Sequence, residues 1–404
     1  MEKEIKILYA NEKKYGAVLR VIGVGGAGGN AVNRMIEENM KGVDFVAINT
    51  DVQVLGKIND PATRLQIGEK ITRGLGAGSN PDIGEQAALE DTEAIIELLE
   101  GANMVFITAG MGGGTGTGAS HVIANHASSM GILTVAVVTK PFLFEREKRM
   151  RVAEEGIKKL KESVDAIIII PNQKLLSLNE PNITYREAYK RADEVLLQAV
   201  RGISDIISST GYQNVDFADV KAIMVGKGMT LMGTGEAKGE KRAEEATRKA
   251  LNSPLLDNVS ISGSTGVLYN ISAAANLTLT EIERISEMIT QHADKEAVIK
   301  FGIIEDESMG ENLRVTVIAT GFRETAAPQP VKAKTPAANL MLGVESSPRP
   351  NASQNFLKSH RYTPTSVDIS GYVNEANMPS MVHVPEDGMD PLDIPTFQRR
   401  QSKK

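Results

Sequence analysis

The sequence predicts an α/β protein with a doubly wound parallel sheet, followed by a long central helix and a second, smaller α+β domain. Apolar, β-branched stretches alternate with helical segments through the first half of the chain, as in successive βαβ units. Three glycine-rich segments, Gly23–Asn30, Thr72–Pro81 and Gly110–Gly118, punctuate this alternation. The chain has 404 residues, which is enough for two domains with a sizeable core.

The composition narrows the class of protein. The chain has no cysteine, which removes disulfides, thiol nucleophiles and cysteine-based metal sites. The first ten residues carry scattered charges and no apolar core of a signal peptide, and no apolar run reaches membrane-spanning length. A net charge of −6 and an aromatic content of 4% argue against non-specific DNA binding and base-stacking surfaces. We therefore expect a cytoplasmic protein with no direct nucleic-acid partner.

The first glycine segment follows a predicted strand at 17–22 and precedes a predicted helix at 31–38. Gly23, Gly25 and Gly28 match the G-x-G-x-x-G pattern, and Asp51 follows a second strand at 45–49. Taken alone, this spacing favours a dinucleotide-binding site of the Rossmann type. The pattern by itself is weak, and a tight strand–helix turn explains it equally well.

The central glycine segment is the most specific feature. Six residues of Gly110–Gly118 are glycine, and the segment lies between an apolar strand at 104–109 and a helix at 119–130. Strand, glycine loop and helix together aim backbone N–H groups at an anion, and Thr115 and Thr117 add hydroxyl donors. We therefore predict a phosphate-binding loop here.

The remaining segments of the first half extend the same alternation. Thr72–Pro81 alone would be an ordinary surface loop, and a helix is predicted from residue 81 to about 100. A strand at 133–138, a charged amphipathic helix at 145–161 and a strand at 167–170 follow. Three glycine loops converging at the carboxyl edge of one parallel sheet suit a triphosphate better than a dinucleotide. No G-x-x-x-x-G-K-[ST] motif occurs, which excludes a P-loop protein.

A long helix is predicted from Thr184 to about Ser209, with a helical apolar period and a stop at Thr210-Gly211. The next loop carries Asn214, Asp216 and Asp219. Asp216 is also a plausible helix N-cap. Residues 221–322 alternate helices and strands, ending in strands at 297–304 and 313–320, and form the predicted α+β domain.

The last 80 residues differ in composition. Ten of the 16 prolines lie between Pro328 and Pro395, and the apolar periodicity is lost. This predicts a disordered C-terminal tail. The tail ends in an apolar cluster between acidic and basic residues, which is typical of a partner-docking peptide. The docking residues are Leu392, Asp393, Ile394, Pro395 and Phe397.

Taken together, these motifs resemble the FtsZ family, the tubulin-like GTPases of bacterial cell division. The resemblance covers residues 16–322 and resumes at 390–401. Its most specific part is G-G-G-T-G-T-G at 112–118. Further matches are G-V-G-G-A-G-G-N-A-V-N at 23–33, N-T-D at 49–51, T-R-G-L-G-A-G-S-N-P at 72–81, V-D-F-A-D-V at 215–220 and L-D-I-P-T-F at 392–397.

The resemblance implies a set of GTP-binding residues: Gly25, Gly26, Ala27, Gly28, Gly29, Asn30, Asn49, Asp51, Ala77, Gly78, Gly112, Gly113, Gly114, Thr115, Gly116, Thr117, Glu145, Arg149, Tyr189 and Asp193. Within it, 77–80 would lie near the terminal phosphate, and Glu145 and Arg149 would contact ribose and phosphate. Tyr189 and Asp193 would bind the base. The Asp193 carboxylate can accept both donors on one edge of guanine, which adenine does not offer, so GTP is favoured over ATP.

The resemblance also implies the catalytic and assembly roles. Asn214, Asp216 and Asp219 would polarise the attacking water, with Mg²⁺ on the GTP phosphates and no dedicated protein ligands apart from help by the two aspartates. Subunits would polymerise head to tail into the filaments of the division (Z) ring at midcell, with each active site shared between neighbours. The tail would dock FtsA, ZipA or SepF, so membrane association would be indirect. The alternatives are an NAD-dependent oxidoreductase and a non-catalytic scaffold.

The predicted boundaries are an N-terminal arm at 1–15, a GTP-binding domain at 16–183, the central helix at 184–210, a C-terminal domain at 211–322, a linker at 323–389 and a docking peptide at 390–404. Four residues depart from the family pattern: Ala27, His121, Arg146 and Gln173. Ala27 and Arg146 stand where glycine is common, and Gln173 where aspartate is. His121 could be a catalytic base, but we expect a helix-capping or surface histidine.

Overall fold

The computed structural model describes residues 16–176, 183–208, 215–253 and 263–322. The predicted N-terminal arm, Asn214, the linker and the docking peptide lie outside the described residues. Among the residues described, no helix is long and apolar enough to cross a membrane.

Within these ranges, ten strands form one hydrogen-bonded sheet in the order β3-β2-β1-β4-β5-β6-β7-β10-β8-β9. The strands are β1 (Leu19–Val24), β2 (Val43–Asn49), β3 (Thr63–Gln66), β4 (Met104–Gly110), β5 (Leu133–Lys140), β6 (Ala166–Pro171), β7 (Gly228–Lys238), β8 (Gly266–Ala273), β9 (Val298–Glu305) and β10 (Asn312–Thr320). Strands β1 to β6 pair in parallel, which confirms the predicted doubly wound sheet.

The second part of the sheet is mixed. Strand β7 continues the parallel part through only two residue pairs with β6, Ala166↔Gly228 and Ile167↔Met229. Strand β10 lies antiparallel between β7 and β8, and β9 pairs in parallel with β8. The last two strands in the sequence are therefore not neighbours. This arrangement, with helices α11 (Arg242–Leu251) and α12 (Leu279–Thr290), confirms the α+β class of the second part.

An apolar core lies on each of the two faces of the parallel strands. Successive residues of one strand point to opposite faces, so Phe106 joins one core and Val105 and Ile107 join the other. The first core is covered by α1 (Gly25–Glu37) and α9 (Tyr185–Ser208). The second is covered by α4 (Pro81–Glu90), α5 (Thr92–Leu99), α6 (Thr115–Ser129) and α7 (Glu147–Lys161). Short helices α2 (Val52–Leu55), α3 (Glu69–Thr72), α8 (Asn172–Leu175) and α10 (Phe217–Met224) complete the α-helices of the described ranges.

Three predicted helix bounds were wrong. Helix α1 begins at Gly25 rather than Ala31, and α6 begins at Thr115 rather than Ala119, so both glycine segments run into the first helical turn. The predicted helix at 81–100 is two helices, separated at Asp91. The Asp91 carboxylate accepts the Gly68 N–H at 2.6 Å, a contact that holds the break in place.

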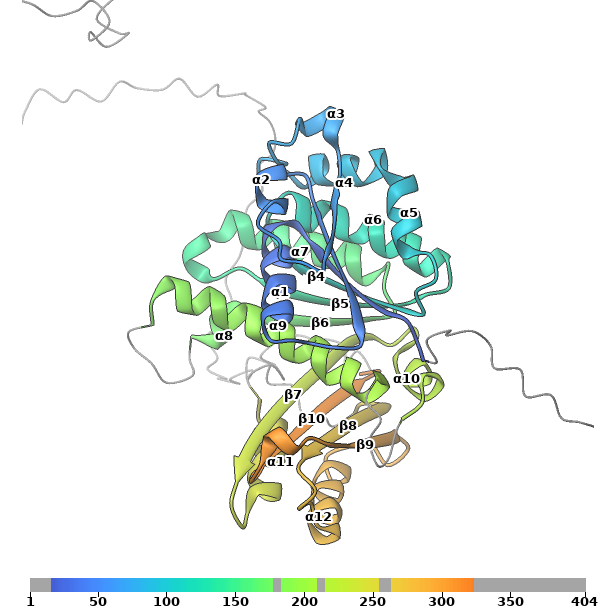
Figure 1. Ribbon diagram of the computed structural model, residues 1–404, viewed down its shortest axis with the longest axis vertical. Helices are drawn as coiled ribbons and strands as arrows, with labels where there is room; N and C mark the ends of the chain where they lie inside the picture. The colour runs from blue at the N-terminus through green and yellow to red at the C-terminus, as the bar shows by residue number, and fades with distance from the viewer. Residues whose placement is uncertain (1–15, 177–182, 209–214, 254–262, 323–404) are drawn as a thin grey trace, which may run out of the picture. The chain divides into compact units, whose positions relative to one another are not determined.

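Helix α9 links the two parts of the sheet, as Figure 1 shows. Its 24 residues span about 36 Å. Ala192, Leu196 and Ile203 face the first core. The carboxyl-terminal end of α9 lies at the amino edge of the parallel strands, where a Cβ on Gly42 would come within 2.8 Å of Ser208. Its amino-terminal end therefore lies toward the carboxyl edge, where the glycine segments are.

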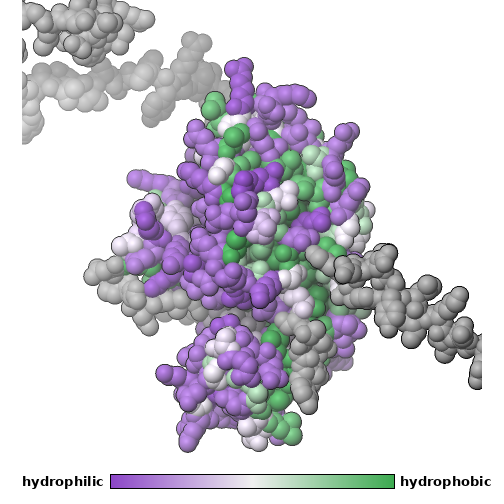
Figure 2. All heavy atoms as spheres, viewed as in Figure 1, coloured by the Kyte–Doolittle hydropathy of each residue, from purple (hydrophilic) through white to green (hydrophobic). Residues whose placement is uncertain are grey.

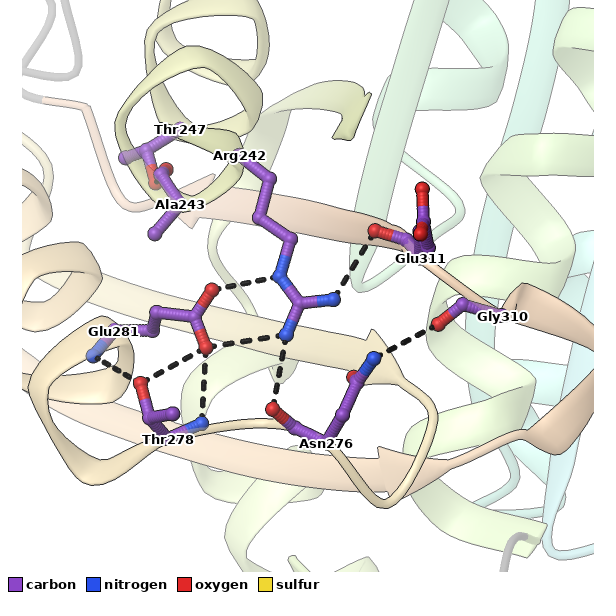
Figure 3. A network of polar contacts seen from close by, with 8 residues as sticks. All are labelled: Arg242, Ala243, Thr247, Asn276, Thr278, Glu281, Gly310 and Glu311. Atoms are coloured by element: carbon purple, nitrogen blue, oxygen red, sulfur yellow. Dashed lines mark hydrogen bonds and ion pairs between the residues drawn. The ribbon is translucent and has the colours of Figure 1, made fainter. Parts of the chain in front are cut away.

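A buried arginine fixes the helices of the second part, as Figure 3 shows. The Arg242 guanidinium donates to both carboxylate oxygens of Glu281, at 2.6 and 3.2 Å. It also donates to the carbonyl oxygens of Glu311 and Asn276, each at 3.1 Å. Glu281 in turn accepts from the N–H and hydroxyl of Thr278, which caps α12. Helices α11 and α12 and the start of β10 are therefore held by one polar network.

Candidate functional site

The three glycine segments meet at the carboxyl edge of β1 and β4. A Cβ on Gly25 would lie 2.8 Å from the backbone nitrogen of Gly116, so the first and central segments touch. A Cβ on Gly114 would lie 2.8 Å from that of Ala77, so the third segment touches the central one. The convergence expected from the sequence is therefore present in the structure.

Part of this junction is open. A Cβ added to Gly26, Gly78 or Gly113 would meet no atom within 4 Å. No side chain caps the first turn of α1 or α6, so their leading N–H groups keep no side-chain partner there. Two long helices thus direct N–H groups without a side-chain cap, and the positive ends of their dipoles, toward an accessible space, which is an arrangement that binds phosphate.

Left-handed backbone at two glycines shapes this space. Gly25 has φ +73° and Gly112 has φ +96°, a region that glycine adopts at low cost. A Cβ on Gly112 would also lie 2.7 Å from the Arg149 carbonyl oxygen. The Ala27 side chain, which departs from the family pattern, is accommodated because its neighbour Gly110 has none; a Cβ there would lie 2.6 Å from that of Ala27.

The polar side chains around the loops form hydrogen bonds within the protein. The Thr115 hydroxyl lies 2.7 Å from the Thr50 hydroxyl, and the Thr117 hydroxyl accepts the Gly112 N–H at 2.8 Å. The Asn49 amide oxygen accepts the Thr50 N–H at 2.8 Å, and the Asp51 carboxylate caps α2. These residues therefore brace the loops. Thr50 was not predicted from the sequence, where only its position between Asn49 and Asp51 pointed to it.

A second group of predicted residues lies beside the amino-terminal end of α9. Glu145 accepts the Phe142 N–H at 2.9 Å and pairs with Arg149 at 2.8 Å. Burial and the nearby Glu145 carboxylate raise the pKa of Tyr189. Phe142 packs edge-on against Tyr189 with ring centroids 5.2 Å apart. The structure therefore brings Glu145, Arg149 and Tyr189 together.

Asp193 lies one helical turn after Tyr189 on α9. Burial raises its pKa to about 7, and the positive charge of Arg34 opposes that shift. A half-buried carboxyl group that is held near its titration point at neutral pH is typical of a ligand-binding position.

The predicted catalytic carboxylates lie at the opposite edge of the sheet. Asp216 caps α10 and accepts the Asp219 N–H at 2.7 Å, which is the helix N-cap that the sequence also allowed for this residue. Asp219 also pairs with Lys300 of β9 at 2.9 Å. Helix α10 leads into β7, whose first residue Gly228 binds the Asp165 carbonyl oxygen just before β6. This is the amino edge of the parallel strands, so the structure does not bring these carboxylates to the glycine segments.

The other three departures each have a defined place. Arg146 has φ +77°, a conformation that explains why glycine is common at this position. The Gln173 amide oxygen accepts the Leu143 N–H at 3.1 Å. The expectation for His121 was wrong, because its exposed fraction is only 9% and its Nε2 lies 3.5 Å from Oε1 of Glu85.

Large apolar side chains stand exposed around the third glycine segment. Leu75 is 80% exposed, and Ile71 and Val52 are also exposed. Figure 2 shows mostly hydrophilic side chains on the visible face, with hydrophobic ones gathered over part of it. No group of three or more metal-binding side chains occurs in the described part of the chain.

Comparison with known proteins agrees with this geometry. Residues 18–180 match the Tubulin/FtsZ family, GTPase domain, and residues 228–323 match the FtsZ family, C-terminal domain. The chain is 49% identical over 387 residues to the cell division protein FtsZ of Pseudomonas aeruginosa, covering 96% of this chain and 97% of that protein. This chain belongs to the FtsZ family.

Other FtsZ proteins support the assignment. FtsZ of Coxiella burnetii is 53% identical over 306 residues, covering 76% of this chain and 79% of that protein. A solved structure described as an empty FtsZ dimer of M. jannaschii superposes with a TM-score of 0.72 and 46% identity, covering 76% of this chain and 88% of that one. The chain is therefore a tubulin-like GTPase family member of the cell-division type, with a nucleotide-binding fold.

Proposed function

We propose that this FtsZ family member binds GTP at the three converging glycine segments and hydrolyses it to GDP and phosphate. The approach of Gly25 to Gly116, together with that of Gly114 to Ala77, is the observation that carries the proposal. One glycine loop suffices for a dinucleotide, whereas three loops with two free helix termini suit a chain of three phosphates. The segment at 77–80 is assigned to the terminal phosphate.

The base is assigned to the amino-terminal end of α9. The Asp193 carboxylate would accept both donors on one edge of guanine, Tyr189 would pack on the base, and Glu145 would hold the ribose. A site built around buried hydrogen bonds discriminates strongly against a base that leaves them unmade. GTP is therefore preferred to ATP.

Water activation is assigned to Asn214, Asp216 and Asp219 of a neighbouring subunit. In one molecule, the glycine segments and α10 lie at opposite edges of the same sheet. The length of α9 from Asp193 to its carboxyl-terminal end, about 20 Å, separates them. A head-to-tail contact would bring α10 of one subunit to the glycine segments of the next. Such a contact does not close on itself and generates a filament. The exposed Leu75, Ile71 and Val52 beside the third segment supply apolar surface for it.

Mg²⁺ is assigned to the GTP phosphates, where it would neutralise negative charge. This fits the donor set, because Mg²⁺ commonly binds phosphates and water with only one or two carboxylates. Asp216 and Asp219 are engaged with an N–H group and Lys300, so they suit an auxiliary role rather than a dedicated metal site.

In the cell, we propose that the filaments form the division ring at midcell. Residues 390–404 would dock a membrane tether of the FtsA, ZipA or SepF type, and residues 323–389 would link that peptide to the GTPase.

A nucleotide titration combined with a phosphate-release assay tests the proposal. We expect tight binding of GTP and GDP, weak binding of ATP and NAD, and phosphate release that rises with assembly in a sedimentation assay. Tight NAD binding without GTP binding would establish the oxidoreductase alternative. GTP binding and assembly without phosphate release would establish the alternative of a non-catalytic scaffold.

A further inference from the structure

Glu85 lies where three helices of the proposed GTP site pack together. Each of these helices begins at, or a few residues after, predicted nucleotide contacts. Helix α4 follows the third glycine segment, α6 begins in the central one, and α7 follows Glu145. How these helices pack against one another therefore determines how the parts of the nucleotide site lie relative to one another.

Helices α4 and α6 touch through their backbones. A Cβ on Gly118 would lie 2.0 Å from the Pro81 carbonyl oxygen, and one on Gly84 would lie 2.4 Å from that of Gly114. Helix α7 comes equally close to α6, since a Cβ on Gly156 would lie 2.2 Å from the Thr117 side chain. These close approaches pack the three helices together, and a polar contact shared by all three would fix how they sit against one another.

Glu85 supplies those contacts. Its Oε1 lies 3.5 Å from Nε2 of His121 on α6, and its Oε2 accepts from Lys159 of α7 at 2.8 Å. The hydrogen bond from Lys159, assisted by His121, lowers the pKa of Glu85, so the carboxylate is ionised at neutral pH. The His121 ring is buried, and its Nδ1 has no hydrogen-bond partner in the described ranges. The unpaired nitrogen of a buried imidazole costs free energy, so the approach of Nε2 to Glu85 is the polar contact that this ring retains.

We propose that Glu85, His121 and Lys159 are positioning residues that hold the third glycine segment at the distance a terminal phosphate requires. The inference rests on the proposed function. Glu85 is close to this segment along α4. Asn80, the last residue of the segment 77–80, caps α4 by accepting the Asp82 N–H at 3.0 Å, and Glu85 lies one helical turn after Asp82. The central segment and Glu145 serve phosphates and ribose that GDP also has. The third segment serves only the phosphate that GDP lacks.

This division gives the network a specific effect. Breaking it should weaken GTP binding and leave GDP binding nearly unchanged. A loss of overall stability would weaken both nucleotides together. The ratio of the two affinities therefore separates positioning from a merely structural role.

The test measures GTP and GDP affinities of the full chain at concentrations where sedimentation shows no assembly. In Glu85→Gln and in His121→Phe, we expect the GTP-to-GDP affinity ratio to fall on the order of tenfold. In the double variant the ratio should fall no further, because either change already breaks the contact. His121→Gln, which keeps a donor close to the Nε2 position, should recover most of the ratio. His126→Phe on the same helix is the matched control and should leave the ratio unchanged.

The result that would overturn the inference is an unchanged ratio in both single variants, or an equal loss for GTP and GDP. An equal effect of His126→Phe would also overturn it. The unaltered chain separates this inference from the proposed function: failure of that chain to bind either nucleotide would overturn both, whereas normal binding with unresponsive variants overturns only the network.

Discussion

The Arg242 Nε lies 2.6 Å from Oε1 of Glu281, and this pair joins the first turns of α11 and α12 (Figure 3). The Arg242 side chain is only 8% exposed, and its guanidinium donates four hydrogen bonds within the protein. Removing one partner of a buried ion pair leaves the other charge unpaired, so Arg242→Ala should lower the free energy of unfolding by about 3–5 kcal/mol. Urea unfolding measures this change.

Arg284 provides the matched control for that prediction. It also pairs with two glutamates, Glu244 and Glu287, but on the exposed face of α12. Arg284→Ala should therefore leave the urea midpoint almost unchanged. Equal effects of the two substitutions would show that burial is not what gives the Arg242 pair its importance.

Asp193 should make nucleotide binding pH-dependent. Burial raises its pKa to about 7, whereas binding of guanine needs the ionised carboxylate. Binding below pH 7 should therefore release a proton, and affinity should rise as pH increases through 7. Titration calorimetry in two buffers of different ionisation enthalpy counts the protons released.

The controls use two asparagine substitutions. Asp193→Asn should bind GTP weakly and release no proton. Burial also raises the pKa of Asp205, to about 6, but Asp205 lies three turns further along α9. Asp205→Asn should keep the proton release at pH 7. Undiminished release in Asp193→Asn would assign the proton to another group.

The same carboxyl group affects stability. Its folded pKa lies above the ordinary value of 3.8, so the folded state binds the proton more tightly than the unfolded state. This contribution to stability is fully present below pH 3.8 and is lost as pH rises through about 7. Without nucleotide, Asp193→Asn should flatten the fall in unfolding midpoint between pH 5 and pH 8, which a pH series of thermal melts would show.

Arg146 should be a strained position. Its φ of +77° with ψ of 159° is a region that glycine occupies and other residues avoid. Arg146→Gly should therefore raise the free energy of unfolding by about 1–3 kcal/mol. Arg146→Ala retains the Cβ and should give no such gain. Equal stability of the two variants by urea unfolding would mean that the backbone there is not strained.

Asp219 tests the shared active site. Asp219→Ala should bind GTP and assemble with the unaltered chain but hydrolyse poorly alone. Mixed into unaltered protein, it should lower phosphate release per unaltered subunit, because contacts between the two kinds lack the carboxylate. Lys300→Ala, which removes the partner of Asp219 at 2.9 Å, is the control for loss of that ion pair. Full turnover by Asp219→Ala, or by protein too dilute to assemble, would refute the shared site.

The C-terminal peptide should be separable from catalysis. Deleting residues 390–404 should spare GTP hydrolysis and abolish binding to a membrane tether, as phosphate release and a pull-down with the purified tether would show. Loss of hydrolysis in the truncated chain would mean that the peptide belongs to the folded GTPase.

The sequence by itself determined the fold class, the family and the three glycine loops at strand ends. These features are encoded locally: strands such as Met104–Gly110 are apolar and β-branched, and a glycine segment at a strand end needs only its own residues to be recognised. The long helix also has its signal within itself, and α9 begins and ends within one residue of the predicted bounds.

Only the tertiary structure decided how distant segments meet. The insertion of β10 between β7 and β8, the break at Asp91 and the burial of His121 each depend on a partner far away in the chain. No local pattern contains Gly68 for Asp91 or Glu85 for His121. The positions of Asp216 and Asp219 likewise required the whole sheet, because the strand order sets which edge carries α10. Periodicity fixes which face of a segment is buried, whereas long-range packing and burial decide what lies against that face.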